Sequence, residues 1–211
     1  MKWIVITSPD AMPGEAFFID RLFHEGLDLL HLRKPEADEE TYAHLIEAIP
    51  ETWHHRLVLH DHFELTHRYA LHGIHLNRRH PEAPAGFSGS CSASCHSFEE
   101  VAQKKSSCDY LFLSPIFNSI SKQGYEAAFT PETLQEAAQK GLIDSQVVAL
   151  GGITLERIPQ LHDWHFGGAA FLGDIWQRMN DPHVSSYLSA LRKRLSRFQS
   201  CQELKRFCHN T

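Results

Sequence analysis

The sequence predicts a (β/α)8 barrel in one domain, and three observations lead to this fold class. The chain has 211 residues, where a domain takes about 150 and the smallest such barrels take ~200. Short apolar runs alternate with amphipathic helical patterns along the whole length, which is typical of parallel sheets covered by helices. No Gly-x-Gly-x-x-Gly follows the first run, which disfavours the alternative, a doubly wound open sheet.

The apolar runs predict the strands, because short runs bounded by polar residues or glycine are typical of strands buried on both faces. They lie at 4–6, 29–32, 57–59, 74–76, 110–113, 147–150 and 169–172. A weaker segment at 88–94 has small side chains and lies where the βα rhythm requires another strand. With this eighth strand the sheet can close into a barrel.

Helices are predicted between the strands from periodicity and capping residues. Apolar residues recur at i, i+3, i+4 and i+7 over 42–49, which predicts one amphipathic helix. A Thr-Pro pair at 130–131 predicts the start of another, which Gly141 ends. A further helix begins at Thr154, and the last has an apolar face over 188–198. We expect the barrel domain to cover 1–199 and a polar tail to cover 200–211.

Composition limits the partners of this chain. Acidic residues outnumber basic ones 26 to 20, so a net charge of -6 argues against a broad surface for nucleic acid or membranes. No apolar run approaches the ~18 residues of a membrane span, and no signal peptide is recognisable. The odd count of 5 cysteines predicts reduced thiols. We therefore expect a cytoplasmic protein with small phosphorylated ligands, and a homo-oligomer is compatible with the sequence.

Polar residues gather at the predicted carboxyl ends of the strands, which is where barrels of this class carry their active sites. These residues are Thr7, His31, Arg33, His60, Asp61, His75, Asn77, Ser94, His96, Ser114, Gly151, Gly152 and Gly173. Several are histidines, in a chain with 16 of them, most of which we expect on exposed helix faces. The ring of strand ends is therefore the candidate site.

Two glycine turns follow the seventh and eighth strands, Gly151-Gly152 and Gly173-Asp174. Backbone N–H groups at such turns can bind phosphate, and loops seven and eight form the usual phosphate site of this fold. The simpler alternative is that the glycines only permit tight turns. We expect one phosphate group to bind here.

The loop at 114–125 is long for a βα connection and carries Ser119, Ser121 and Lys122. Two hydroxyls and one cation suit a second anion that must be covered and later released. The simpler alternative is a solvated loop with an incidental lysine.

An ordered series of short motifs resembles the thiamine phosphate synthase and TenI superfamily over nearly the whole chain. The series is His31-Leu32-Arg33-Lys34, Asp61, Gly73-Ile74-His75-Leu76, Ser94, His96, Asp109-Tyr110, Ser114-Pro115-Ile116-Phe117, Ser119, Lys122 and Ala149-Leu150-Gly151-Gly152-Ile153. Each motif is weak alone, but their order and spacing are specific. The resemblance implies the same barrel and an enzyme that joins a pyrimidine methyl pyrophosphate to thiazole phosphate, expelling pyrophosphate with magnesium present.

The resemblance also implies roles for individual residues. Arg33, Ser94 and Lys122 would be catalytic, stabilising the charge that develops on the departing pyrophosphate. Asp61 would hold Mg²⁺. The residues implied for substrate binding are His31, His60, His75, Ser119, Ser121, Gly151, Gly152, Gly173 and Asp174.

The chain also departs from the usual pattern of the synthases. His31 and His60 replace the usual Gln and Asn, and Lys34 stands one position from the usual second cation. His80 stands where a second magnesium carboxylate is expected, and the loss of a hard oxygen ligand weakens magnesium binding. Pro115 occupies the position of the acid–base histidine of TenI-type tautomerases, and proline cannot transfer protons.

Synthase activity is therefore the leading interpretation, and three others stay open. One is a divergent TenI-like thiazole phosphate isomerase or a non-catalytic binder of thiazole phosphate. Another is an unrelated barrel with a phosphorylated ligand. The last is a zinc site, since imidazole and thiolate suit zinc, although the spacing of the cysteines is unusual for it. Its candidate ligands are His60, His62, His75, His80, Cys91, Cys95 and His96.

Overall fold

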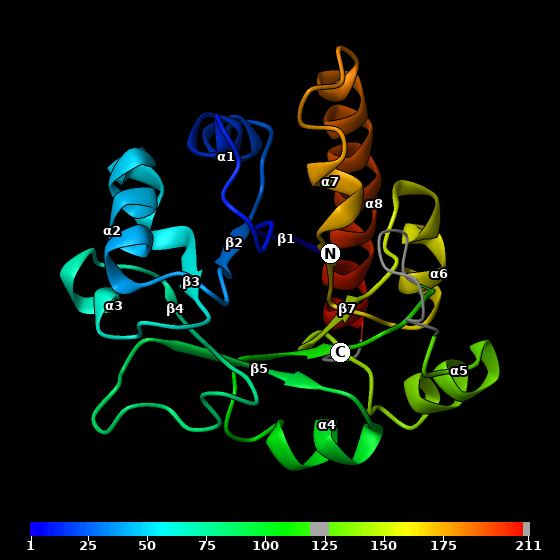
Figure 1. Ribbon diagram of the computed structural model, residues 1–211. Helices are drawn as coiled ribbons and strands as arrows, with labels where there is room; N and C mark the ends of the chain where they lie inside the picture. The colour runs from blue at the N-terminus through cyan, green and yellow to red at the C-terminus, as the bar shows by residue number, and fades with distance from the viewer. Residues whose placement is uncertain (119–126, 209–211) are drawn as a thin grey trace.

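The strands form one closed parallel barrel in the order β1 to β8 (Figure 1), which confirms the predicted fold class. The computed structural model describes residues 1–118 and 127–208, with side chains as far as residue 198. The strands are β1 (Lys2–Ile6), β2 (Leu29–Leu32), β3 (Leu57–Leu59), β4 (Gly73–Leu76), β5 (Ser90–Cys95), β6 (Tyr110–Leu113), β7 (Val147–Leu150) and β8 (Gly168–Phe171).

The weak segment predicted at 88–94 is the strand β5, shifted by one to two residues. Its small side chains fit because Ser92 and Ala93 lie between neighbours on both sides, pairing with β4 and β6. β8 closes the barrel through the pair Ile4 and Ala170. The alternation of strands and helices therefore predicted a strand that the hydrophobicity of the segment alone did not indicate.

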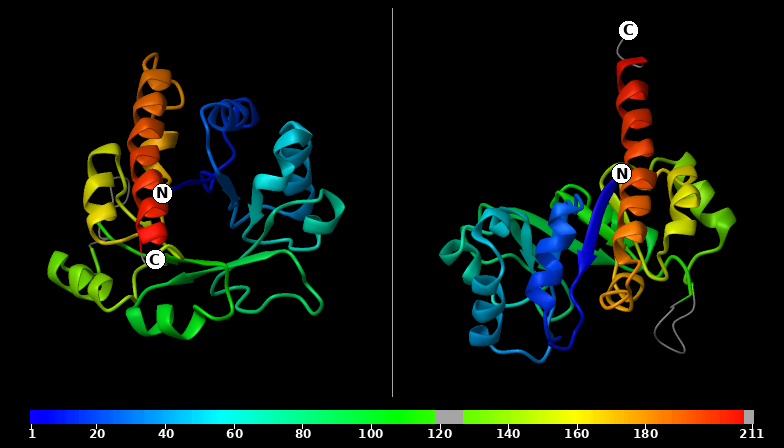
Figure 2. Two further views of the ribbon diagram at one scale, coloured as in Figure 1. Left: turned by 180° about the vertical axis from the view of Figure 1, so that it is seen from behind. Right: turned by 90° about the horizontal axis from the view of Figure 1, so that it is seen from above.

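Helices surround the barrel on its outer face (Figures 1 and 2). They are α1 (Glu15–His24), α2 (Glu39–Ala48), α3 (Leu65–Arg68), α4 (Phe98–Lys104), α5 (Pro131–Gln139), α6 (Ile158–Asp163), α7 (Gly173–Trp176) and α8 (Val184–Cys208), with short 3-10 helices η1 (Glu51–Arg56) and η2 (Leu155–Arg157). Thr130 caps α5 by accepting from the N–H of Thr133, and Gly141 follows its end with a φ of 71°. Thr154 precedes η2, which leads into α6.

Two features of the helical layer bear on the site. β4 and β5 are joined by residues 77–89 without a helix, so this connection is free to form a loop at the barrel mouth. α8 extends past the barrel as a single helix (Figure 2). This helix continues through residue 199, where we expected the barrel domain to end, and the boundary between domain and tail stays a prediction. Among the described residues, no helix has the length and apolar character needed to cross a membrane.

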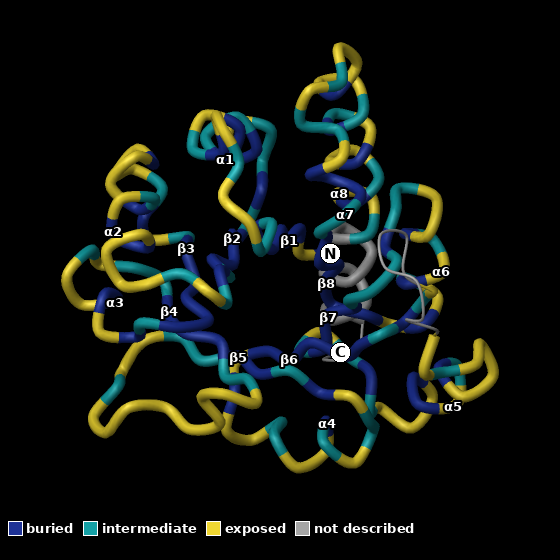
Figure 3. Tube along the Cα trace, in the orientation of Figure 1, coloured by how far each residue is buried: buried dark blue, intermediate teal, exposed yellow. Residues whose placement is uncertain are grey.

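The strands are buried and the exposed residues lie mainly on the surrounding helices and loops (Figure 3). The buried apolar residues form two clusters. Outward-facing side chains such as Trp3, Leu30 and Leu59 pack against the helices. Inside the barrel, a smaller apolar cluster includes Ile4, Ile6, Leu29, Val58, Tyr110, Phe112, Val148 and Ala170. The interior also holds buried polar side chains from the β2 to β6 side, and these begin the site.

Candidate active site

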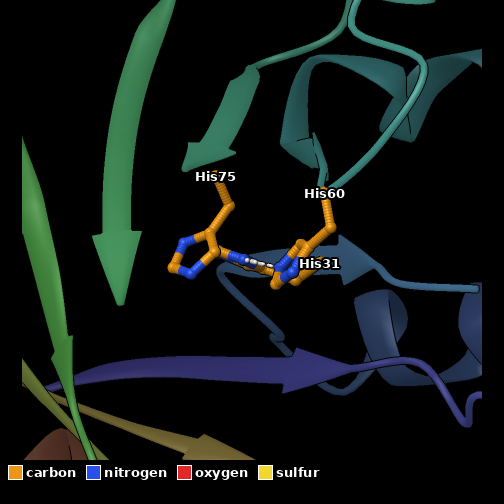
Figure 4. Close-up of side chains that lie close together, drawn as sticks. All are labelled: His31, His60 and His75. Carbon is orange, nitrogen blue, oxygen red and sulfur yellow. Dashed lines mark hydrogen bonds between the residues drawn. The ribbon is translucent and has the colours of Figure 1, made fainter. Parts of the chain in front are cut away.

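Three histidines converge inside the barrel from neighbouring strands (Figure 4). His31 lies on β2, His60 directly follows β3, and His75 lies on β4. Alternation along β2 sends Leu30 and Leu32 to the outer core and therefore turns His31 inward. His31 and His75 are fully buried, and His60 is 4% exposed. The structure thus brings together three of the predicted binding residues.

Hydrogen bonds connect the histidines to hydroxyl groups of β5 and β6. His31 Nδ1 lies 3.0 Å from His60 Nε2, and His31 Nε2 lies 2.8 Å from the Tyr110 hydroxyl. His75 Nδ1 lies 2.9 Å from Ser92 Oγ, and His75 Nε2 lies 2.8 Å from Ser94 Oγ. Ser94, a predicted catalytic residue, is therefore held by His75.

Ring contacts fix the orientation of the same group. The rings of His60 and His75 stack with centroids 4.2 Å apart. The ring of Phe112 lies 4.7 Å from the rings of both His31 and His75. The result is an aromatic wall built of uncharged rings with polar edges.

Burial keeps this wall uncharged at neutral pH. Desolvation lowers the pKa of His31 and His60 well below the ordinary value of 6.5, with neighbouring histidines adding to the effect. Burial lowers the pKa of His75 to about 3. A neutral imidazole has one donor and one acceptor nitrogen, so the wall suits a neutral heteroaromatic ring.

Arg33 supplies positive charge beside the histidines. It follows β2, and its backbone N–H donates to Thr7 Oγ1 at 2.8 Å while the Thr7 hydroxyl donates to the Arg33 carbonyl at 3.1 Å. Its guanidinium makes no hydrogen bond or ion pair within the described part of the chain. Arg33 lies two residues after His31, just past the end of β2, and its charge helps to lower the pKa of both His60 and His75. The predicted anion-binding arginine is therefore available.

Lys34 is not available as a second cation, contrary to the sequence expectation. It is 3% exposed, and its Nζ donates to both carboxylate oxygens of Glu15 at 2.7 and 2.8 Å and to the Asp10 carbonyl at 2.8 Å. The physical reason is alternation: Lys34 follows Arg33 directly and turns away from it toward α1.

Asp61 is occupied by other side chains of the protein. The Arg79 guanidinium donates to both of its oxygens, at 2.7 and 2.8 Å from Nη2 and 3.1 Å from Nε. His80 Nε2 lies 3.1 Å from Asp61 Oδ1, and the Tyr42 hydroxyl donates to Oδ2 at 3.2 Å. Neither carboxylate oxygen is therefore free.

These residues do not fit a magnesium site built from protein ligands. Mg²⁺ needs near-octahedral oxygen ligands, but the Asp61 carboxylate is already engaged and the imidazole of His80 stands at the second expected position. His31, His60 and His75 offer ligand atoms within 4.8 Å of one another, but imidazole suits transition metals and both ring nitrogens of His31 and His75 have hydrogen-bond partners.

The seven residues of the zinc hypothesis are not gathered in one place. His60 and His75 lie together, but His62 Nε2 contacts the Ala37 carbonyl at 3.1 Å. His96 Nδ1 lies 3.0 Å from the Ser114 carbonyl, and Cys95 lies in the outer core. The zinc set expected from the sequence therefore does not form within the described residues.

The Gly151-Gly152 turn packs directly under the chain that follows β6. Both residues have positive φ, 100° and 63°. A Cβ on Gly152 would lie 2.3 Å from the Asn118 carbonyl oxygen, and one on Gly151 would lie 2.9 Å from the Pro115 Cα. The positive φ values agree with the simpler alternative of a tight turn, the close approach is a further reason for both glycines, and the phosphate role stays a prediction.

At the second turn, the Asp174 side chain faces α8 instead of the barrel mouth. It is 6% exposed, contacts Arg178 at 3.2 Å and accepts from the Tyr187 hydroxyl. Trp176 Nε1 donates to the Ile6 carbonyl at 2.7 Å and holds α7 against β1. Gly173 and Asp174 can therefore contribute only backbone N–H groups to an anion. Ser119, Ser121 and Lys122 lie outside the described residues.

The sequence analysis missed Ser92, Tyr110, Tyr42 and Arg79 as site residues. Ser92 lies two positions before Ser94 and shares its face, so strand alternation could have identified it. Tyr110 pairs with Ser92 across β5 and β6; the sequence analysis included it in an apolar run and in the family motifs but gave it no role at the site. Nothing in the sequence places Tyr42 or Arg79 near Asp61, because both contacts depend on tertiary structure.

Comparison with known proteins agrees with the fold and identifies the family. The family model for thiamine monophosphate synthase matches residues 4–175. The thiamine-phosphate synthase of Salmonella typhimurium is 30% identical over 190 residues, covering 82% of this chain and 86% of that protein. That of Latilactobacillus sakei is 30% identical over 162 residues, covering 73% and 71%.

A solved structure is similar over nearly the full length. The thiamine phosphate pyrophosphorylase from Bacteroides thetaiotaomicron has a TM-score of 0.80 and 42% identity, covering 95% of this chain and 98% of that one. The corresponding protein from Pyrococcus furiosus has a TM-score of 0.75 at 18% identity and shares the fold. The resemblance found in the motifs is confirmed: the chain belongs to the thiamine monophosphate synthase family.

Proposed function

We propose that this protein is a thiamine-phosphate synthase, which joins a pyrimidine methyl diphosphate to thiazole phosphate. The observation that carries the proposal is the Arg33 guanidinium, which has no hydrogen-bond or ion-pair partner among the described residues and stands at the carboxyl end of the barrel, where the buried neutral imidazoles lie. In the reaction, the methylene C–O bond breaks and its electron pair leaves with the diphosphate oxygen. The lone pair of the thiazole nitrogen forms the new C–N bond, which gives thiamine phosphate and pyrophosphate.

His31, His60 and His75 suit the pyrimidine part of this reaction. Within the described part of the chain, His60 Nδ1 is the ring nitrogen without a hydrogen-bond partner, and it can donate to or accept from an aminopyrimidine. The other ring nitrogens bond within the protein and hold the rings in place. The methylene carbon gains positive charge as the diphosphate departs. Because burial lowers the pKa of all three histidines, they carry no charge that would oppose this cation.

The two anions would occupy different parts of the mouth. Arg33 and the Ser94 hydroxyl would stabilise the leaving diphosphate, together with Ser119, Ser121 and Lys122, which the family resemblance implies. The phosphate of the thiazole would bind backbone N–H groups at Gly151-Gly152 and Gly173-Asp174. Magnesium is an expectation that comes from the family, and no step above depends on it.

The isomerase alternative is disfavoured by one residue. Pro115, at the position of the tautomerase histidine, has no group that can transfer a proton, and its Cα packs over Gly151. Binding of thiazole phosphate without turnover stays a second candidate, because the glycine turns alone could hold that ligand.

The test is incubation of the pure protein with both precursors and Mg²⁺, alongside reactions that omit one precursor. A synthase produces thiamine phosphate only in the complete mixture. An isomerase changes the proton spectrum of thiazole phosphate alone, and a binder gives calorimetric heat with that ligand but no product. Either of the last two results would overturn the proposal.

A further inference from the structure

The loop after β4 is folded to return two basic side chains onto Asp61. The Asn77 side chain anchors this turn: its Nδ2 donates to the His60 carbonyl at 2.8 Å, and its Oδ1 accepts from the backbone N–H of Arg79 at 2.9 Å. The backbone closes the turn between Asn77 N–H and the His80 carbonyl at 3.0 Å. Arg79 is therefore positioned by the end of β3 as well as by its own loop.

Asp61 acts as a fixed support for the Arg79 guanidinium. The Asp61 side chain is 10% exposed, whereas that of Arg79 is 44% exposed. The carboxylate accepts from Arg79 Nε and Nη2, and the buried Tyr42 hydroxyl holds it from the other side. Nη1 of Arg79 has no partner among the described residues. An oriented guanidinium with spare donors is typical of a phosphate-binding group.

Arg79 faces a pocket of about 530 Å³ at the same end of the barrel as the histidines. The pocket lies between the loops that follow β2, β3 and β4, with Pro35 and Asp61 among its lining residues. The Asn77 side chain bonds to the carbonyl of His60, so the turn that carries Arg79 lies against a member of the histidine cluster. Glu64 and Glu82 also line the pocket. Because their carboxylates repel anions, an anion in this pocket is expected to bind at Arg79.

We infer that Arg79 binds the diphosphate of the pyrimidine substrate directly and takes the place of a divalent cation. This inference rests on the proposed function. Its basis is that Asp61, the carboxylate expected to hold the metal, instead holds a guanidinium, while His80 replaces the other carboxylate. Arg79 and Arg33 receive the charge that stays on the diphosphate oxygen when the methylene C–O bond breaks. A metal ion at Asp61 would first have to displace Arg79.

The first experiment measures inorganic pyrophosphate binding by calorimetry in EDTA. We expect Arg79→Ala to weaken binding at least about tenfold, the effect of losing a charge-assisted hydrogen bond. Arg79→Lys should recover only part of this, because lysine lacks the guanidinium fork. The control is Arg78→Ala, which removes an exposed neighbouring arginine and should change binding less than about twofold. Equal affinity of Arg79→Ala and the parent would overturn the inference.

The second experiment compares the rate of thiamine phosphate formation in EDTA with the rate in excess Mg²⁺. The inference predicts rates within about threefold of each other, a difference well below 1 kcal/mol. Activity that vanishes in EDTA and returns with Mg²⁺ would contradict it and leave the proposed function intact. Pyrophosphate binding that depends on Arg79 in a protein without turnover would support the anion site and reject the proposed function.

Discussion

His31, His60 and His75 lie where a charged imidazole would have no ion-pair partner among the described residues. The family usually has neutral side chains at the first two positions, so the histidines keep the neutrality and change the donors and acceptors. Motif comparison identified these substitutions, and it could not show that the three rings contact one another. Those contacts depend on register, which places His31 of β2 beside the end of β3.

Folding stability should therefore fall steeply as the solution becomes acidic. A histidine with a folded pKa below its unfolded value favours folding above about pH 6.5, and that stability is lost as pH falls toward the folded value, about 3 for His75. Each such histidine contributes a slope of about 1.4 kcal/mol per pH unit. Urea unfolding of His31→Gln between pH 6.5 and 5 should show a slope smaller by this amount. The exposed-site control His44→Gln should keep the parent slope.

The buried pair of Lys34 and Glu15 is structural. Glu15→Gln leaves the Lys34 ammonium buried without its carboxylate, so we expect a loss of about 3–5 kcal/mol in the free energy of unfolding. The double variant Glu15→Leu with Lys34→Met removes both charges and should be much closer to the parent. If the double variant is as unstable as the single one, the pair is not what stabilises this position.

A variant of Lys122 distinguishes a role in catalysis from a role in binding thiazole phosphate. If Lys122 covers the leaving diphosphate, Lys122→Ala should lower turnover on the order of a hundredfold, as loss of an oxyanion donor does. Thiazole phosphate affinity should stay nearly unchanged, since that ligand binds at the glycine turns. The control Lys140→Ala removes an exposed lysine directly after α5 and should leave both quantities as they are. Unchanged turnover of Lys122→Ala at saturating substrates would show that Lys122 has no such role.

At the scale of the elements, the turn after β7 is constrained by packing that the sequence does not show. Gly151 and Gly152 were predicted as a phosphate turn, but their backbone is also packed against residues 115–118. The length and glycine content of a turn can be recognised in a sequence. The segment that packs against it cannot, because Asn118 and Gly152 are brought together only by the pairing of β6 with β7.

A pair of glycine variants measures this constraint. Gly141 and Gly152 both have positive φ, but a Cβ on Gly141 meets nothing within 4 Å. Gly141→Ala should cost about 1–2 kcal/mol from backbone strain alone. Gly152→Ala should cost about 1–3 kcal/mol more, because its Cβ would overlap the Asn118 carbonyl oxygen. Thermal unfolding measures the loss of stability in both variants. Equal losses would mean that the Asn118 backbone moves aside at little cost in free energy.

For the molecule as a whole, alternation of strands and helices predicted the barrel, including the weak strand β5. It did not predict the division of the interior, where Ile4, Ile6 and Val148 form an apolar side and His31, His75 and Ser92 a polar one. That division follows from which residue of each alternating pair faces inward. The ion pair between Asp61 and Arg79 could not be predicted from the sequence either, because it depends on the turn that Asn77 stabilises.

The central claim is that this polar interior supports condensation of two precursors with loss of pyrophosphate. The most direct measurement is the pair of initial rates at which thiamine phosphate and pyrophosphate appear when the pure protein receives both precursors. We predict equal rates, both zero when either precursor is omitted, because each new C–N bond requires one broken C–O bond. Pyrophosphate release without thiamine phosphate, or no release at all from folded protein, would contradict the claim.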